Sequence, residues 1–222
     1  MKKNLFKATT LALTAFVVSA CNLVGNLGTL AMDSEDAVKK VKNLVTDNID
    51  TGEWKIIGIS WNEGGGNGQL ANDLNSGFVS VNMVKKDDGR EYSQSFIGQL
   101  HYKPTAPDPN TRRDTPLEYD KITPIDVAKL DPAAIVSQLE EAKKMLPEQY
   151  VFKSLASYEM DATVPSEITG RGEYSDQQTA EFVMNVVEKG KETVTSAGQT
   201  SIVYYEVTFE VAPDGTLTMQ TD

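Results

Sequence analysis

The feature that most constrains the fold is an order of elements that occurs twice along the chain. In the first half, a helical stretch beginning at Asp33 or Ser34 precedes three strand-like stretches, over 53–61, 78–85 and 91–102. In the second half, a helical stretch precedes four strand-like stretches: a helix over 132–146, then strands over 150–160, 179–190, 201–211 and 216–220. This order predicts an α+β fold of two tandem units, each a helix packed on an antiparallel meander sheet of about three to four strands.

Both expected helices carry start signals and one apolar face. Asp33 and Ser34 are good N-caps, and Asp131 followed by Pro132 is typical of a helix start. In the expected strand over 91–102, alternation places apolar side chains on one face, namely Tyr92, Phe96, Leu100 and Tyr102. Its other face is polar and includes His101, the only histidine of the chain.

A proline-rich stretch without periodicity separates the halves. It covers 104–124 and is interpreted as a linker or an extended crossing segment between a first unit at 33–103 and a second at 125–222. Whether the two sheets abut or join edge to edge, and whether the halves form one domain or two, stays open. The element order is similar to that of repeated-module envelope proteins such as the β-lactamase-inhibitor-like and PepSY-like folds, at the level of pattern alone.

The N-terminus has the three regions of a secretory signal. Lys2, Lys3 and Lys7 precede an uncharged run over 8–18, which is far shorter than the ~30 Å hydrocarbon core requires of a spanning helix. Residues 1–20 are therefore expected to be a signal peptide.

The end of this signal, Val18-Ser19-Ala20-Cys21, resembles the lipobox of bacterial lipoprotein precursors. The resemblance implies cleavage between Ala20 and Cys21, a diacylglyceryl group on the Cys21 thiol and an acyl chain such as palmitate on its new amine. Asn22 follows the cysteine in place of the Asp that marks inner-membrane retention, which favours the outer membrane in a Gram-negative source. The alternative, an ordinary signal cleaved elsewhere, leaves a lone free thiol in a secreted chain.

The stretch over 21–32 is expected to be a tether. It is uncharged, and it either stays flexible or places Leu23, Leu27 and Leu30 on the membrane or on the folded domain. Without its first 20 residues the chain keeps 18 of its 21 basic residues against 32 acidic ones, a net charge of −14. Such an acidic surface repels phosphate backbones, which excludes nucleic acid as a partner.

The chain carries few residues from which an active centre can be built. His101 has no base-orienting motif beside it, and one histidine with one lipidated cysteine is too few for a zinc site. The glycine-rich stretch over 64–68 lacks the Lys-Ser/Thr of a phosphate loop, and the stretches over 72–77 and 108–114 lack the ligand spacing of a calcium loop. We therefore expect no catalytic residue, metal or cofactor.

The expected function is a non-enzymatic binding or assembly module of the cell envelope. The membrane is reached through acyl chains on Cys21, and an unknown envelope protein or cell-wall component is the partner. Candidate binding aromatics in the expected strands are Trp61, Tyr204 and Tyr205. The alternatives are an envelope hydrolase that uses carboxylates and a carrier of an apolar ligand; the narrow apolar helix faces do not suggest the cavity that a carrier needs.

Overall fold

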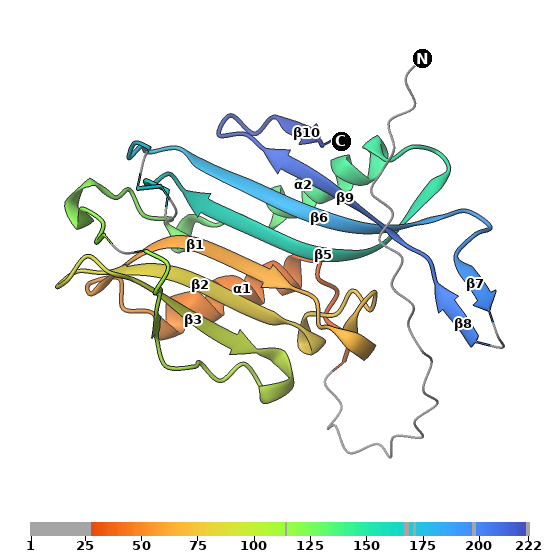
Figure 1. Cartoon of the computed structure of the whole chain (residues 1–222), viewed down its shortest axis with the longest axis horizontal. Helices are drawn as coiled ribbons and strands as arrows, with labels where there is room; N and C mark the ends of the chain where they lie inside the picture. The colour runs from red at the N-terminus through yellow and green to blue at the C-terminus, as the bar shows by residue number, and fades with distance from the viewer. Residues whose placement is uncertain (1–27, 114, 167–168, 171, 197–198, 221–222) are drawn as a thin grey trace.

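The computed structural model describes residues 28–220, apart from 114, 167–168, 171 and 197–198. Two helices and one large sheet dominate this part of the chain (Figure 1). The elements are α1 (Glu35–Asn48), β1 (Trp54–Asn62), β2 (Phe78–Lys85), β3 (Glu91–Ile97), β4 (Asp108–Pro109), α2 (Pro132–Met145), β5 (Tyr150–Ala162), β6 (Gln178–Glu188), β7 (Thr193–Ser196), β8 (Gln199–Ile202), β9 (Tyr205–Val211) and β10 (Leu217–Met219). The α+β class predicted from the sequence is confirmed.

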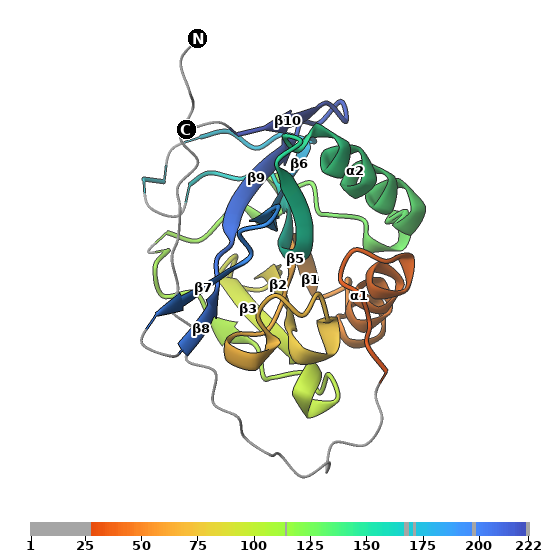
Figure 2. The same ribbon diagram turned by 90° about the vertical axis from the view of Figure 1, so that its right-hand side faces the viewer.

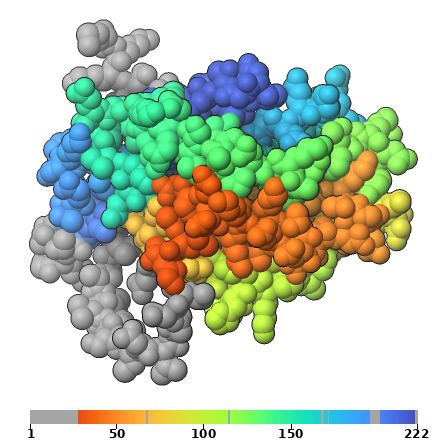
Figure 3. Space-filling model, turned by 180° about the vertical axis from the view of Figure 1, so that it is seen from behind, coloured from red at the N-terminus to blue at the C-terminus, as the bar shows by residue number. Residues whose placement is uncertain are grey.

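The large sheet has eight strands in the order β10-β9-β6-β5-β1-β2-β3-β4, and every neighbouring pair is antiparallel. Because β1 pairs with β5, strands from both halves of the chain share one continuous sheet. A separate hairpin, β7–β8, lies between β6 and β9 in the chain. Both helices cover the same face of the sheet (Figures 2 and 3).

The two predicted helices form where their local signals indicate. The Ser34 side chain accepts a hydrogen bond from the Ala37 amide in the first turn of α1, and Asp131 caps α2 in the same way through the amides of Ala133 and Ala134. Each helix then buries one stripe on the sheet: Ala37, Val38, Val41, Leu44 and Val45 from α1, with Ile135, Leu139 and Ala142 from α2. Neither helix, nor any other among the described residues, is long and apolar enough to cross a membrane.

A row of stacked aromatic rings runs through the core beneath the helices. Trp61 stacks on Tyr158 with 4.4 Å between ring centroids, Tyr158 on Phe182 at 5.6 Å, and Phe182 on Phe209 at 5.2 Å. The four rings come from β1, β5, β6 and β9, so the row crosses the β1–β5 junction. Burial of these large apolar surfaces stabilises the joined sheet.

Two predicted strands end differently in the structure. The strand expected over 91–102 stops at Ile97, because Gly98–Leu100 forms a 3₁₀ turn and the backbone of His101 and Tyr102 is left-handed. Gly98 packs closely on the chain before β2, where a Cβ would lie 2.5 Å from the Asn75 carbonyl oxygen. His101 and Leu100 are therefore exposed beyond the strand and not on its faces. The strand expected over 201–211 is divided between β8 and β9, and the β7–β8 hairpin was not predicted.

The proline-rich stretch over 104–124 crosses the molecule in contact with it. Leu117 and Ile122 are buried, and the Lys55 ammonium donates to the carbonyls of Tyr119 and Ile122 at 2.7 and 2.8 Å. β4, within this stretch, pairs with β3. The stretch therefore packs on the body of the protein as a crossing segment.

Candidate functional site

The face of the sheet opposite the helices is the candidate site. Figure 1 looks onto this face, with the helices behind the strands. Successive side chains of a strand point to opposite faces, so residues that alternate with the buried aromatic row point to this side. We call it the open face.

One cross-strand row on the open face spans six strands. Register pairs join the following residues in order: Glu210 of β9, Glu181 of β6, Glu159 of β5, Ser60 of β1, Ser80 of β2 and Ser95 of β3. Directly opposed residues have Cβ atoms about 4.5–5.5 Å apart, so the three carboxylates are immediate neighbours. We call Glu159, Glu181 and Glu210 the acidic row; all three are exposed.

Asp161 lies beside the acidic row in a more enclosed position. It is opposite Gly58 of β1, and a Cβ on Gly58 would lie 2.9 Å from the Asp161 Oδ1 atom. Because Gly58 has no side chain, the Asp161 carboxyl group can lie against β1. Burial, followed by the charges of Glu159, Glu181 and Glu91, raises the pKa of Asp161 from 3.8 to about 7.

A hollow of about 440 Å³ contains these carboxyl groups. Its lining includes Asp161 and the acidic row, together with the β9–β10 turn at Pro213. Burial and the charges of its two neighbours in the row also raise the pKa of Glu181. The hollow therefore places a carboxyl that holds a proton near neutral pH beside the three carboxyl groups of the acidic row.

A buried ion pair limits the open face at one end. The Arg113 Nε atom lies 2.8 Å from Glu91 Oε2, both side chains are 8% exposed, and Arg113 Nη1 donates to the Pro165 carbonyl at 2.9 Å. The pair joins the crossing segment, β3 and the chain after β5. A smaller hollow of about 220 Å³ lies between Arg113 and Asp161.

A second polar cluster limits the face at the other end. Asn185 donates to Glu63 at 2.6 Å and to Ser154 at 2.9 Å, and the Ser154 hydroxyl donates to the same Glu63 oxygen at 3.2 Å. Burial raises the pKa of Glu63, although these hydrogen bonds oppose the rise. Nearby, Gln69 donates to the Tyr204 hydroxyl at 2.7 Å.

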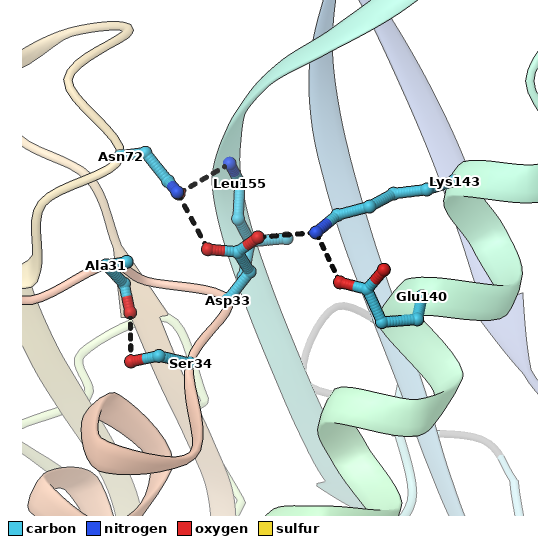
Figure 4. A network of polar contacts seen from close by, with 7 residues as sticks. All are labelled: Ala31, Asp33, Ser34, Asn72, Glu140, Lys143 and Leu155. Atoms are coloured by element: carbon cyan, nitrogen blue, oxygen red, sulfur yellow. Dashed lines mark hydrogen bonds and ion pairs between the residues drawn. The ribbon is translucent and has the colours of Figure 1, made fainter.

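A third polar network belongs to the helices and not to the open face (Figure 4). The Lys143 ammonium lies 2.6 Å from both Asp33 and Glu140, and Asn72 donates to Asp33 at 2.7 Å while accepting from the Leu155 amide at 3.1 Å. Burial of Asp33 raises its pKa, but the hydrogen bonds from Lys143 and Asn72 outweigh burial and lower it. The network connects four parts of the fold: the start of α1, the end of α2, strand β5 and the chain that leads into β2. Its role is therefore structural.

The aromatic residues singled out in the sequence lie apart from one another. Trp61 is 1% exposed and offers no surface to a partner, because it stacks on Tyr158 beneath the helices. Tyr204 is also buried, whereas Tyr205 is half-buried against Tyr150. Binding of a partner by Tyr205 stays a prediction, and Ala20 and Cys21 lie outside the described residues.

The rejected motifs of the sequence have structural roles. Gly64 allows close packing, since a Cβ there would lie 2.1 Å from the Ser76 carbonyl oxygen, and Gly66–Gly68 is a single 3₁₀ turn with no α-helix after it. Asp73 caps another such turn through the Asn75 amide. Within residues 28–220, as far as they are described, no three His, Cys, Asp or Glu side chains form a group that could hold a metal ion.

Sequence reasoning missed the acidic row and Asp161. A signal was present, because acids lie between apolar residues inside predicted strands, as at Glu181 in 179–190 and Glu210 in 201–211. What the sequence lacked was the register that places residues from β5, β6 and β9 side by side.

The helices leave more open space than their narrow apolar faces indicate. A groove of about 540 Å³ lies between α2 and the sheet, with Ile135 on one side and Tyr158, Met160 and Ala180 on the other. The expectation that no sizeable cavity lies between helix and sheet is therefore wrong. A second groove, of about 660 Å³, lies beside the end of α1.

Comparison of the chain with protein-family models, with curated proteins and with solved structures finds no match.

Proposed function

We propose that this chain is a lipid-anchored protein of the bacterial cell envelope that binds a partner on the open face of its sheet and has no catalytic activity. The lipobox-like Val18–Cys21 sequence supports the anchor, which exposes the folded part to the periplasm or the cell exterior. In a Gram-negative source the outer membrane is the favoured location. The open face supports the binding role.

The observation that carries the binding role is the acidic row. Like charges directly opposite one another on neighbouring strands destabilise a sheet, yet three carboxylates are opposed here. The ion pairs of the described residues include none with Glu159, Glu181 or Glu210. A partner that brings amino or guanidinium groups to this face would relieve the repulsion, so we propose an envelope protein or cell-wall component with a basic surface.

Crosslinking in cells tests this role. The variant Glu159→Gln/Glu181→Gln/Glu210→Gln removes the charges of the acidic row and keeps the side-chain shapes. The matched control, Asp36→Asn/Asp47→Asn/Glu141→Gln, removes the same charge from the exposed sides of the helices. We expect the row variant to lose the crosslinked partner and the control to keep it; retention by both would show that the open face is not the binding surface.

A second candidate, the envelope hydrolase, is favoured by one observation. Asp161, with a pKa of about 7, shares a hollow with the carboxyl groups of the acidic row, and two carboxyl groups in one site can act as general acid and general base. The test is hydrolysis of cell-wall polysaccharide by the wild type, Asp161→Asn and the control Glu141→Gln. Turnover that only Asp161→Asn abolishes would support the hydrolase, and no turnover by the wild type would eliminate it.

We further propose that the sheet consists of two tandem helix-plus-sheet units joined edge to edge. The sheet order supports this proposal, because β1, β2 and β3, with β4 of the crossing segment, occupy one half of the sheet and β5, β6, β9 and β10 the other. The corresponding residues are 33–103 and 125–222, with 104–124 crossing between them.

A further inference from the structure

Exposed apolar side chains gather at one end of the molecule. The large apolar residues that the described part of the chain exposes are 37–58% accessible: Phe78, Leu100, Met145, Val151, Val194 and Ile202. We call this set the apolar end. Phe78 begins β2, Val151 is the second residue of β5, and Met145 ends α2.

The other members of the set reach the same end. Leu100 follows the end of β3, whose Ile97 pairs with Phe78. Val194 and Ile202 belong to the β7–β8 hairpin, which connects the end of β6 to the start of β9. In Figure 1 these strand ends, the end of α2 and the hairpin lie toward the right-hand side.

The chain also enters the fold at this end. Asn75 donates to the Gly28 carbonyl at 2.6 Å, and the Leu30 amide donates to Asp73 at 2.8 Å, both within the chain that leads into β2. Six residues, 22–27, separate the proposed anchor at Cys21 from Gly28, so the two are seven residue steps apart along the chain. A stretch of that length spans at most about 25 Å when fully extended.

We infer that the apolar end rests on the lipid bilayer and sets the orientation of the protein on the membrane; the inference depends on the proposed anchor at Cys21. Acyl chains on Cys21 supply the affinity, and the short tether keeps the apolar end within reach of the lipid surface. Scattered apolar side chains alone would bind a membrane weakly. When Cys21 already holds the protein on the membrane, these side chains need only favour one orientation of the protein over the others. Lys103, Lys153 and Lys189 are exposed in the same segments and can extend toward lipid headgroups.

This orientation accounts for the position of the candidate site. The strands run away from the bilayer, so the acidic row stands on the side of the molecule and not against anionic headgroups. The β2–β3 turn at Asp87 is then the far end, roughly 30 Å from Phe78 along the strand.

Depth-dependent quenching on vesicles tests the inference with the full lipidated protein. A polarity-sensitive maleimide dye is attached to Leu100→Cys and to Val194→Cys, with Asp87→Cys as the control at the far end. Each variant is reconstituted in vesicles of phosphatidylethanolamine and phosphatidylglycerol that carry a spin-labelled quencher in the headgroup region. We expect strong quenching and a blue-shifted emission at Leu100 and Val194, and neither at Asp87.

The controls separate failure of the inference from failure of the anchor. The wild type has no cysteine other than Cys21, so it should take up no dye and should float with the vesicles. If it takes up dye or does not float, the anchor and the inference both fail. If it floats undyed but Leu100 and Val194 are quenched no more than Asp87, the anchor stands and the apolar end does not contact the bilayer.

Discussion

At the residue scale, Asp161 connects the stability of the fold to pH. Its pKa is about 7 in the folded protein against an ordinary value of 3.8, so the folded state binds the proton more tightly than the unfolded state. Its contribution to stability is therefore fully present below pH 3.8 and is lost as pH rises through 7.

Asp161→Asn removes this titration while keeping the shape of the side chain. We expect the stability of the variant relative to the wild type to increase between pH 4 and pH 8, by about 1–2 kcal/mol because the side chain is partly solvated. Urea unfolding of both proteins across this range is the measurement. A difference that does not change with pH would contradict the raised pKa.

Glu181 lies in the middle of the acidic row, between Glu159 and Glu210. Glu181→Gln removes both like-charge contacts, so we expect the free energy of unfolding to increase by about 0.5–1 kcal/mol at low salt, with the gain shrinking at high salt. Thermal unfolding at two salt concentrations measures this, with Glu141→Gln as the control. If Glu181→Gln were less stable than the wild type, the Glu181 charge would be stabilised by other groups of the protein, which would contradict repulsion within the acidic row.

At the element scale, the crossing segment depends on the buried pair between Arg113 and Glu91. Arg113→Met leaves Glu91 buried without its partner, and we expect a loss of about 3 kcal/mol. The double variant Arg113→Met/Glu91→Met should recover much of that loss, because no lone charge remains. Chemical denaturation of the three proteins distinguishes this outcome from a pair that contributes only through packing, for which the double variant would be the least stable.

Elements whose signals are local were predictable from the sequence. The caps at Ser34 and Asp131 and the apolar helix stripes indicated both helices, and the strand expected over 78–85 matches β2. The 3₁₀ turn that ends β3 was not predicted; its Gly98 packs on the backbone of Asn75, a contact between distant parts of the chain that no local signal reveals. The candidate site escaped prediction for a similar reason, since strand register is a long-range property.

At the scale of the whole molecule, the net negative charge implies that binding of a basic partner depends on salt concentration. A partner attracted to the acidic row should crosslink less as ionic strength rises, because exposed charges are screened over about 10 Å at 0.1 M salt and about 3 Å at 1 M. Crosslinking yield in membranes at increasing sodium chloride measures this dependence. A yield that does not fall would indicate an apolar contact elsewhere, such as the groove beneath α2.

The membrane anchor underlies both the proposed function and the proposed orientation. The intact mass of the mature protein extracted from membranes, measured beside that of Cys21→Ala, tests it most directly. We expect the wild type to begin at Cys21 with added acyl mass, and the variant to be unprocessed or released from the membrane. A free thiol at Cys21, or cleavage at another position, would contradict the lipid anchor and leave a secreted protein whose partner need not be near a membrane.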